Sequence, residues 1–155
     1  MQSVGNLALL DLPKVAFLSS RRVPPAAVMR AYDWANEMGE RGVCVMGGFQ
    51  SALERDVLKL LLSYGKSPIV MALARSMWRR VPEEFRSQID EGRMLVVSPV
   101  SQKIIRVSKE SAEKRNAWIL DNCDEAVFAS LDPSGSLARL VASRPQLRCR
   151  NVMEE

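Results

Sequence analysis

The sequence predicts an α/β fold in which a mostly parallel sheet of five or six strands carries helices on both faces. Short, continuous apolar runs alternate along the chain with segments whose apolar residues recur at helical spacing, and the connections between them are short. With 155 residues, 47% of them hydrophobic, the chain can bury a core without disulfides or metal. We therefore expect one domain over residues 1–142, followed by a tail or short edge strand over residues 143–155.

Each predicted element has its own local signal. The first strand, residues 15–19, is an apolar run closed by polar residues, and Pro24 and Pro25 then open a helix that ends near Gly39 and Gly42. The same reasoning predicts strands over residues 43–46, 69–73, 94–97 and 126–131, helices over residues 53–62, 83–91 and 109–122, and an edge strand or loose tail over residues 147–152. This order is typical of a Rossmann-like fold. Its ligand crevice lies beyond the carboxyl ends of the strands where strand order reverses, which we expect between the first and fourth strands.

The most informative stretch is residues 43–62, VCVMGGFQSALERDVLKLLL, where an apolar strand breaks into a double glycine and a helix follows. Gly47 and Gly48 allow close approach of the backbone to a ligand, while Ser51 and Glu54 have the spacing of a capping box. Free amides at a helix start attract phosphate or another anion. The turn therefore predicts an anion-binding corner.

Composition excludes several classes of chemistry. The chain has no histidine, so Ser-His and Cys-His nucleophiles are excluded, and the scattered Cys44, Cys123 and Cys149 form no metal-binding pair. We expect reduced thiols, no metal, no cofactor and no catalytic residue, which favours a binding protein over an enzyme. No run approaches the ~20 apolar residues of a membrane span, and the N-terminus lacks a signal-peptide pattern. These features predict a soluble cytoplasmic protein with no membrane contact.

Basic residues cluster in the segments that follow predicted strands. The net charge is only +4, but placement at the carboxyl ends would concentrate it on one rim. The cations expected there are Arg21, Arg22, Arg75, Arg79, Arg80, Lys103 and Arg106. Trp78 among the arginines and Phe49 in the glycine turn are the expected stacking surfaces for bases, whereas Trp34 and Trp118 lie on helix faces and are expected to pack in the core.

Five motifs, GNLALLDLPKVAFLSSR, VMGG, SPV, KRNAWIL and PSGSL, occur in an order that resembles the Rossmann domain of the DNA-processing protein A (DprA/Smf) family. That family belongs to a wider nucleotide-binding group that includes the LOG phosphoribohydrolases. The resemblance runs from about Gly5 to Val141 and places the family's Gly-Ser-Arg turn, Arg-Asn pair and Ser-Gly-Ser turn on this chain. The chain departs from the family at Ser19, at Ala117 and at Gln50, where the family has glycine, arginine and a basic residue.

The resemblance implies a protein that binds single-stranded nucleic acid or a nucleotide phosphate, is linked to DNA processing, and pairs as a homodimer. For Arg115 and Asn116 the alternative is a buried pair that ties the helix to the sheet. The expected ligand-binding residues are Ser19, Ser20, Arg21, Gly47, Gly48, Phe49, Gln50, Arg75, Arg79, Arg80, Arg115, Asn116, Ser134, Gly135 and Ser136.

Two other functions stay open. A LOG-like nucleoside monophosphate phosphoribohydrolase needs a glutamate after its glycine loop, and residues 133–139 supply none; Glu54 is the carboxylate nearest the expected crevice. A sensor that binds a nucleotide signal and passes it to a partner protein is the third reading. The sequence leaves the identity of the bound nucleic acid or nucleotide open.

Overall fold

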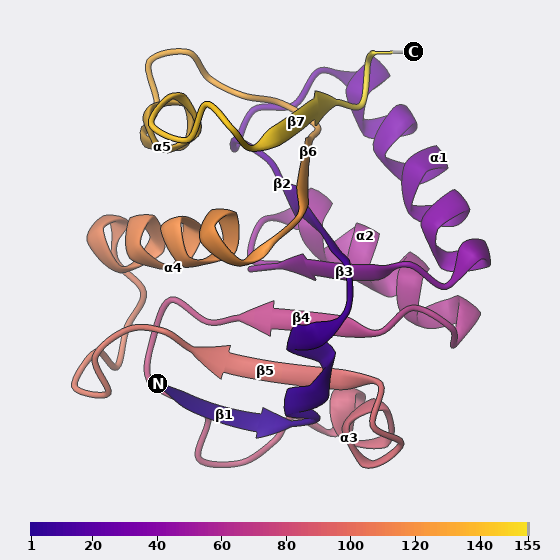
Figure 1. Ribbon diagram of the computed structural model, residues 1–155, viewed down its shortest axis with the longest axis vertical. Coiled ribbons are helices and arrows are strands. Elements are labelled where there is room, and N and C mark those ends of the chain that lie inside the picture. Colours follow the sequence, from indigo (N-terminus) through magenta and orange to yellow (C-terminus); the bar gives the residue numbers. More distant parts are fainter. Residues whose placement is uncertain (155) are drawn as a thin grey trace.

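Strand pairing in the computed structural model, which describes residues 1–154, builds one seven-stranded sheet in the order β1-β5-β4-β3-β2-β6-β7 (Figure 1). All neighbouring strands are parallel except β1, which is antiparallel to β5. The strands are β1 (Gln2–Gly5), β2 (Lys14–Leu18), β3 (Cys44–Gly47), β4 (Ile69–Ala72), β5 (Met94–Ser98), β6 (Glu125–Phe128) and β7 (Arg148–Asn151). The predicted α/β class and parallel order are confirmed, and the sheet is larger than the five or six strands expected.

Helices cover both faces of this sheet. Strand side chains alternate between the two faces, so Val45 and Met46 of β3 belong to different buried clusters. One cluster packs under α1 (Pro25–Arg41), α2 (Ala52–Tyr64) and α3 (Glu83–Asp90), and the other under the 3-10 helix η1 (Leu7–Asp11), α4 (Lys109–Asn122) and α5 (Ser136–Ala142). Continuous apolar strands are buried on both sides for this reason. Within residues 1–154 the structure contains no helix with the length and hydropathy of a membrane span.

Helix ends follow the capping residues closely. Ser51 accepts a hydrogen bond from the backbone of Glu54 at 3.3 Å, and the Glu54 carboxylate accepts one from the Ser51 amide at 3.0 Å, as the capping-box spacing predicts. α1 ends at Gly42, whose φ of 70° is left-handed. The prediction that Gly39 helps to end α1 is wrong, because Gly39 is buried inside that helix against the ring of Tyr64.

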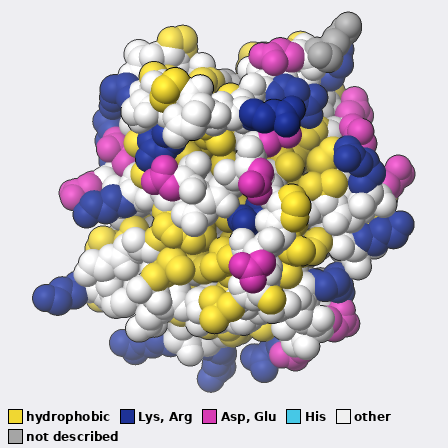
Figure 2. Space-filling view, viewed as in Figure 1, with side chains coloured by type: hydrophobic (Ala, Val, Ile, Leu, Met, Phe, Trp, Pro, Cys, Tyr) yellow, Lys and Arg dark blue, Asp and Glu magenta, His cyan; other side chains and the backbone are white. Residues whose placement is uncertain are grey.

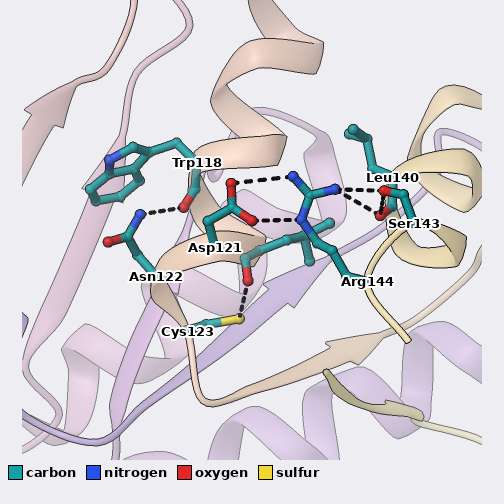
Figure 3. A network of polar contacts seen from close by, with 8 residues as sticks. Trp118, Asp121, Asn122, Cys123, Leu140, Ser143 and Arg144 are labelled. Atoms are coloured by element: carbon teal, nitrogen blue, oxygen red, sulfur yellow. Dashed lines mark hydrogen bonds and ion pairs between the residues drawn. The ribbon is translucent and has the colours of Figure 1, made fainter. Parts of the chain in front are cut away.

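A bidentate ion pair fixes the segment after α5 to α4 (Figure 3). Arg144 donates from Nε to Oδ1 of Asp121 at 2.7 Å and from Nη2 to Oδ2 at 3.2 Å. The same guanidinium donates from Nη1 to the carbonyl of Leu140 at 2.9 Å. Its hydrogen bonds to Asp121 raise the pKa of Arg144 above the ordinary value of an arginine. The pair therefore holds the chain that leads into β7 against the α4 side of the sheet.

The point at which strand order reverses differs from the prediction. After β5 the chain crosses through α4 to β6, which pairs with β2, so the reversal lies between the predicted first and fifth strands. The predicted first and fourth strands, β2 and β5, are separated by β3 and β4. The crevice of such folds forms at the reversal, so the loops after β2 and β6 form its centre.

The buried thiol of Cys44 on β3 is expected to make the free energy of unfolding fall at alkaline pH. Its side chain is buried, and burial raises the pKa of the thiol from 9.0 to about 11. A raised pKa means that the folded state holds the proton more tightly, so this contribution is complete below pH 9.0 and is lost as pH rises through about 11. Across that interval, wild type is expected to lose about 1–2 kcal/mol more unfolding free energy than Cys44→Ala. Urea denaturation at several pH values measures this, and parallel declines would contradict it.

Candidate functional site

Hydrogen bonds join the two loops at the strand-order reversal. The Ser20 amide donates to the Ser130 carbonyl at 2.9 Å, and the Ser20 hydroxyl accepts from the Asp132 amide at 2.9 Å. On the other side the Ser130 hydroxyl donates to the carbonyl of Arg22 at 2.8 Å. The loops enclose an open hollow of about 840 Å³, whose lining includes Ser19, Ser20, Arg21, Asn116, Ser134, Gly135 and Ser136. Seven of the predicted ligand residues therefore meet here.

The serine-glycine turn in this hollow is organised around a carboxylate. Asp132 accepts hydrogen bonds from the amide of Ser134 at 3.0 Å and from its hydroxyl at 2.9 Å, and these bonds lower the pKa of Asp132. The Gly135 amide donates to the carbonyl of Asp132 at 3.0 Å. Ser134 and Gly135 thus use their donors to build the turn. Ser136, at the start of α5, lines this hollow and the adjoining crevice.

A buried arginine lies at the centre of the candidate site. Arg115 is 7% exposed; its Nε donates to Oδ1 of Asn116 at 2.8 Å and its Nη1 donates to Oε1 of Gln50 at 3.2 Å. Among residues 1–154 no carboxylate forms an ion pair with this guanidinium. Burial lowers the pKa of Arg115 and the charge of Glu54 opposes that shift, but an arginine stays protonated in proteins. The site therefore holds a buried positive charge whose hydrogen-bonding partners are neutral amides.

Gly48 is required by this arginine. A Cβ built on Gly48 would lie 2.5 Å from Nη1 of Arg115 and 2.6 Å from its Cζ, so a side chain there would displace the guanidinium. Gly47, in contrast, ends β3, and its Cβ would meet the carbonyl of Phe17 at 3.1 Å. The glycine turn predicted from the sequence therefore has two roles, one for strand packing and one for the arginine.

A crevice lies between Gln50 and Asn116, which hydrogen-bond to Arg115, and the loop after β2 at the strand-order reversal. Arg21, Gln50, Lys109, Asn116 and Ser136 line a hollow of about 530 Å³ beside the first turn of α4. Arg21 is exposed there, whereas Arg115 is buried beneath Gln50 and Asn116. Cationic and amide donors from the loops after β2 and β3 and from α4 therefore converge on one crevice, with Glu113 as the carboxylate in its lining. Donors of these kinds suit phosphate oxygens.

The second group of predicted arginines lies in a neighbouring hollow of about 580 Å³. Arg75, Arg79 and Arg80 line it with Trp78, in the loop that follows β4. Gln102 ties this loop to the one after β5, because its side chain accepts from the Met77 amide at 3.0 Å and donates to Ser98 Oγ at 2.9 Å. A fourth cavity is lined by both Arg75 and Arg115 and thus adjoins both groups. Lys103 and Arg106 are exposed and line none of these hollows.

The predicted stacking role of Phe49 does not agree with its position. Phe49 has a φ of 49° and is 4% exposed within the core cluster under α1, α2 and α3. The positive φ turns the chain after Gly48 and leaves little of the side chain exposed, and Phe49 lines the inner wall of the cavity that Arg75 and Arg115 also line. Trp78 is partly exposed and stacks on Phe85, with ring centroids 5.8 Å apart and planes at 7°. Trp78 is therefore the aromatic surface available at this rim.

Sequence reasoning missed the cations on helices. Arg55 and Lys59 lie in the first two turns of α2, Lys109 begins α4, and Arg139 follows the turn into α5. All four line hollows of the candidate site. A helix that follows a parallel strand begins at the carboxyl edge of the sheet, so its first turns share the rim with the loops. This position in the helix was the signal available in the sequence.

Comparisons with known proteins were made at the levels of sequence and structure. No protein-family model and no curated protein matches the sequence. Among solved structures, DNA processing protein A from Helicobacter pylori, described for its single-stranded DNA binding mode, aligns with a TM-score of 0.72 and 23% identity over 96% of this chain and 69% of that one. The Streptococcus pneumoniae protein aligns with a TM-score of 0.74 and 17% identity over 96% of this chain and 53% of that one.

This chain has the Rossmann fold of DNA processing protein A. The resemblance read from the motifs is confirmed at the level of fold. The molybdenum cofactor binding protein from Rippkaea orientalis shares the DprA-like fold more distantly, with a TM-score of 0.60 and 11% identity over 90% of this chain and 75% of that one. The chain spans only about half of the Streptococcus pneumoniae protein.

Proposed function

We propose that this chain is a DprA-like protein that binds single-stranded nucleic acid through its phosphates in the basic crevice at the carboxyl ends of the strands. The observation that carries the proposal is Arg115, a buried guanidinium that pairs with amide oxygens of Asn116 and Gln50 and with no carboxylate of residues 1–154. Glu54 acts on this guanidinium through its charge but forms no ion pair with it, so a buried charge is left without a direct ionic partner, which a bound phosphate would supply. The single-stranded DNA binding described for the Helicobacter pylori protein of the same fold supports this polymer.

Phosphate contacts are expected from both arginine groups. Arg21, with Arg115, would hold one stretch of backbone, and Arg79 and Arg80 would hold the next across the adjoining hollows. Partly exposed Trp78 lies between these cations and offers a ring to an unpaired base. Such a surface favours a single strand, whose bases are free to stack, over a duplex.

Reversing the charge of Arg79 and Arg80 tests the proposal. Arg79→Glu/Arg80→Glu is expected to bind a fluorescein-labelled oligothymidine at least about tenfold more weakly than wild type, and the slope of log K against log salt is expected to become shallower by about 1.4. Fluorescence anisotropy at several salt concentrations measures both quantities.

The matched control is Arg41→Glu/Lys66→Glu, which changes the net charge by the same amount at the opposite end of the strands. Arg41 ends α1 just before β3, and Lys66 lies just before β4. The control is expected to bind nearly as wild type does. Equal affinity of the Arg79/Arg80 variant and wild type, or equal weakening by both double variants, would contradict a localised crevice.

The geometry does not favour a phosphoribohydrolase. Glu54, the carboxylate that the sequence places nearest the crevice, is 9% exposed, and its Oε1 accepts from the Ser51 amide in the capping box. A carboxylate in this role stabilises α2 and is poorly placed to act on a ribose. Incubation with AMP is expected to release no adenine, and release at enzyme-like rates would overturn the assignment as a binding protein.

Two further expectations remain part of the proposal. The resemblance implies that the domain pairs as a homodimer, and the sequence, with no membrane-span or signal-peptide pattern, implies that it works in the cytoplasm. Light scattering after size-exclusion chromatography tests the first, and fractionation of expressing cells tests the second.

A further inference from the structure

We propose that the apolar cavity beside Arg115 is a base pocket, which receives one nucleobase while the attached phosphate lies on the guanidinium. This inference rests on the proposed function and names the ligand chemistry of the same site. The cavity lies between α2 and the segment from β4 to α3, and its volume is about 360 Å³. That volume lies within the range of about 300–1,000 Å³ typical of small-molecule sites.

The walls of the base pocket suit a flat aromatic ring. Its lining has an aliphatic part, Leu58, Leu62, Met71 and Leu73, and an aromatic part, Phe49, Trp78 and Phe85. The rings of Trp78 and Phe85 are nearly parallel, at 7°, and Phe85 is buried at 7% exposure while Trp78 is partly exposed. Phe85 thus fixes the plane of Trp78 before any ligand arrives. An aromatic wall of fixed orientation is what stacking on a base requires.

The charges that line the base pocket favour an anionic ligand. Arg55, Lys59, Arg75 and Arg115 line it, against the single carboxylate of Glu84. Gln50 and Val107 line both this pocket and the phosphate crevice, so the apolar cavity and the cationic crevice adjoin. A ligand that fills both must carry a flat apolar part and an anion next to it. A nucleobase joined through its sugar to a 5′ phosphate has this composition.

Two sources could supply that chemistry, a free mononucleotide or one base of a single strand, and the experiment has an arm for each. In the first arm, calorimetry compares deoxyadenosine monophosphate with deoxyribose 5-phosphate on the wild-type protein. In the second, anisotropy compares a short oligonucleotide with the same oligonucleotide in which every base is removed. The phosphate is retained in each comparison, so a difference reports the base alone.

The expected result is a preference of at least about tenfold for the base-bearing ligand in at least one arm. Trp78→Ala is expected to remove that preference while leaving binding of the ligand without a base unchanged. Trp78→Phe, which keeps a ring on Phe85, is the matched variant and is expected to retain most of the preference. Circular dichroism verifies that both variants fold.

A preference confined to the mononucleotide arm identifies a free nucleotide as the ligand, and a preference in the oligonucleotide arm, with or without one in the other arm, identifies a strand. Equal binding with and without the base in both arms would overturn the base pocket and leave phosphate binding in the crevice intact. A preference that Trp78→Ala does not change would also overturn it. If the wild-type protein bound no oligonucleotide, the proposed function itself would be overturned.

Discussion

Gly48→Ala is expected to weaken binding of single-stranded oligonucleotide about 10- to 100-fold while leaving the fold nearly intact. The new Cβ would lie 2.5 Å from Nη1 of Arg115, so the guanidinium must leave its position beside Gln50. Only the end of a long side chain has to move, and Gly48 does not have a positive φ, so the backbone accommodates alanine. A charge-assisted contact to phosphate is then lost, which accounts for the expected size of the effect. Anisotropy titration measures it.

Gly65→Ala is the matched control for this prediction. Gly65 caps α2 with a φ of 65°, and a Cβ there would meet Nη1 of Arg93 at 3.9 Å, an ordinary van der Waals contact. Gly65 lines none of the hollows of the candidate site. Alanine there is expected to cost about 1 kcal/mol of stability through the left-handed backbone, yet to leave binding unchanged. Arg115→Gln should lose as much binding as Gly48→Ala, and the double variant should lose no more than either. Normal binding by Gly48→Ala would show that the position of Arg115 does not matter.

Gly39→Val is expected to destabilise the fold by about 2–3 kcal/mol, the largest loss of stability among the substitutions considered. Gly39 lies inside α1, where α1 packs on α2, and its Cβ would lie 2.5 Å from Cδ2 of Tyr64. The ring cannot easily yield, because its hydroxyl donates to Oδ1 of Asn36 of α1 at 2.9 Å and thereby holds the ring against Gly39. Urea denaturation monitored by circular dichroism measures the loss.

A double-mutant cycle identifies the cause of that loss. Tyr64→Ala removes the ring that a valine would meet, so Gly39→Val/Tyr64→Ala is expected to lose at least about 1 kcal/mol less than the sum of the single losses. Additive losses would assign the effect of Gly39→Val to helix propensity or to other neighbours. Neither residue lines the crevice, so oligonucleotide binding by the folded fraction should not change.

The central part of the fold is readable from the sequence because its signals are local. Strands β2 to β6 are apolar runs, and α1 to α4 carry helical periodicity between them. β1 has no such run; its residues form a strand only because they pair with β5, and Asn6 then anchors the chain by donating to the Gly92 carbonyl at 2.9 Å. The strand-order reversal was misplaced for the same reason, since pairing between β2 and β6 joins residues far apart in sequence.

In the candidate site, too, the features set by local sequence were predicted and those set by tertiary contacts were not. The motifs brought Gly48, Gln50, Arg115 and Asn116 together correctly, because each follows or faces the carboxyl end of a strand. The burial of Phe49 depends on its positive φ, which could not be predicted because phenylalanine rarely adopts that conformation. The use of Ser134 as a partner of Asp132 depends on a side-chain hydrogen bond within the turn. Local sequence therefore predicted which of these residues lie together, and tertiary packing decided which of their groups are free.

The composition of the two outermost strands bears on whether copies of this protein can pair edge to edge. β1 and β7 each have only four residues, and mainly polar or charged side chains flank their unpaired backbone edges. Arg148 and Arg150 on β7 carry like charges, so a second β7 approaching edge to edge would meet repulsion as well as a short ladder. At high protein concentration, edge-to-edge pairing of copies through β1 or β7 should therefore be disfavoured. Arg148→Val/Arg150→Val should make such pairing through β7 easier.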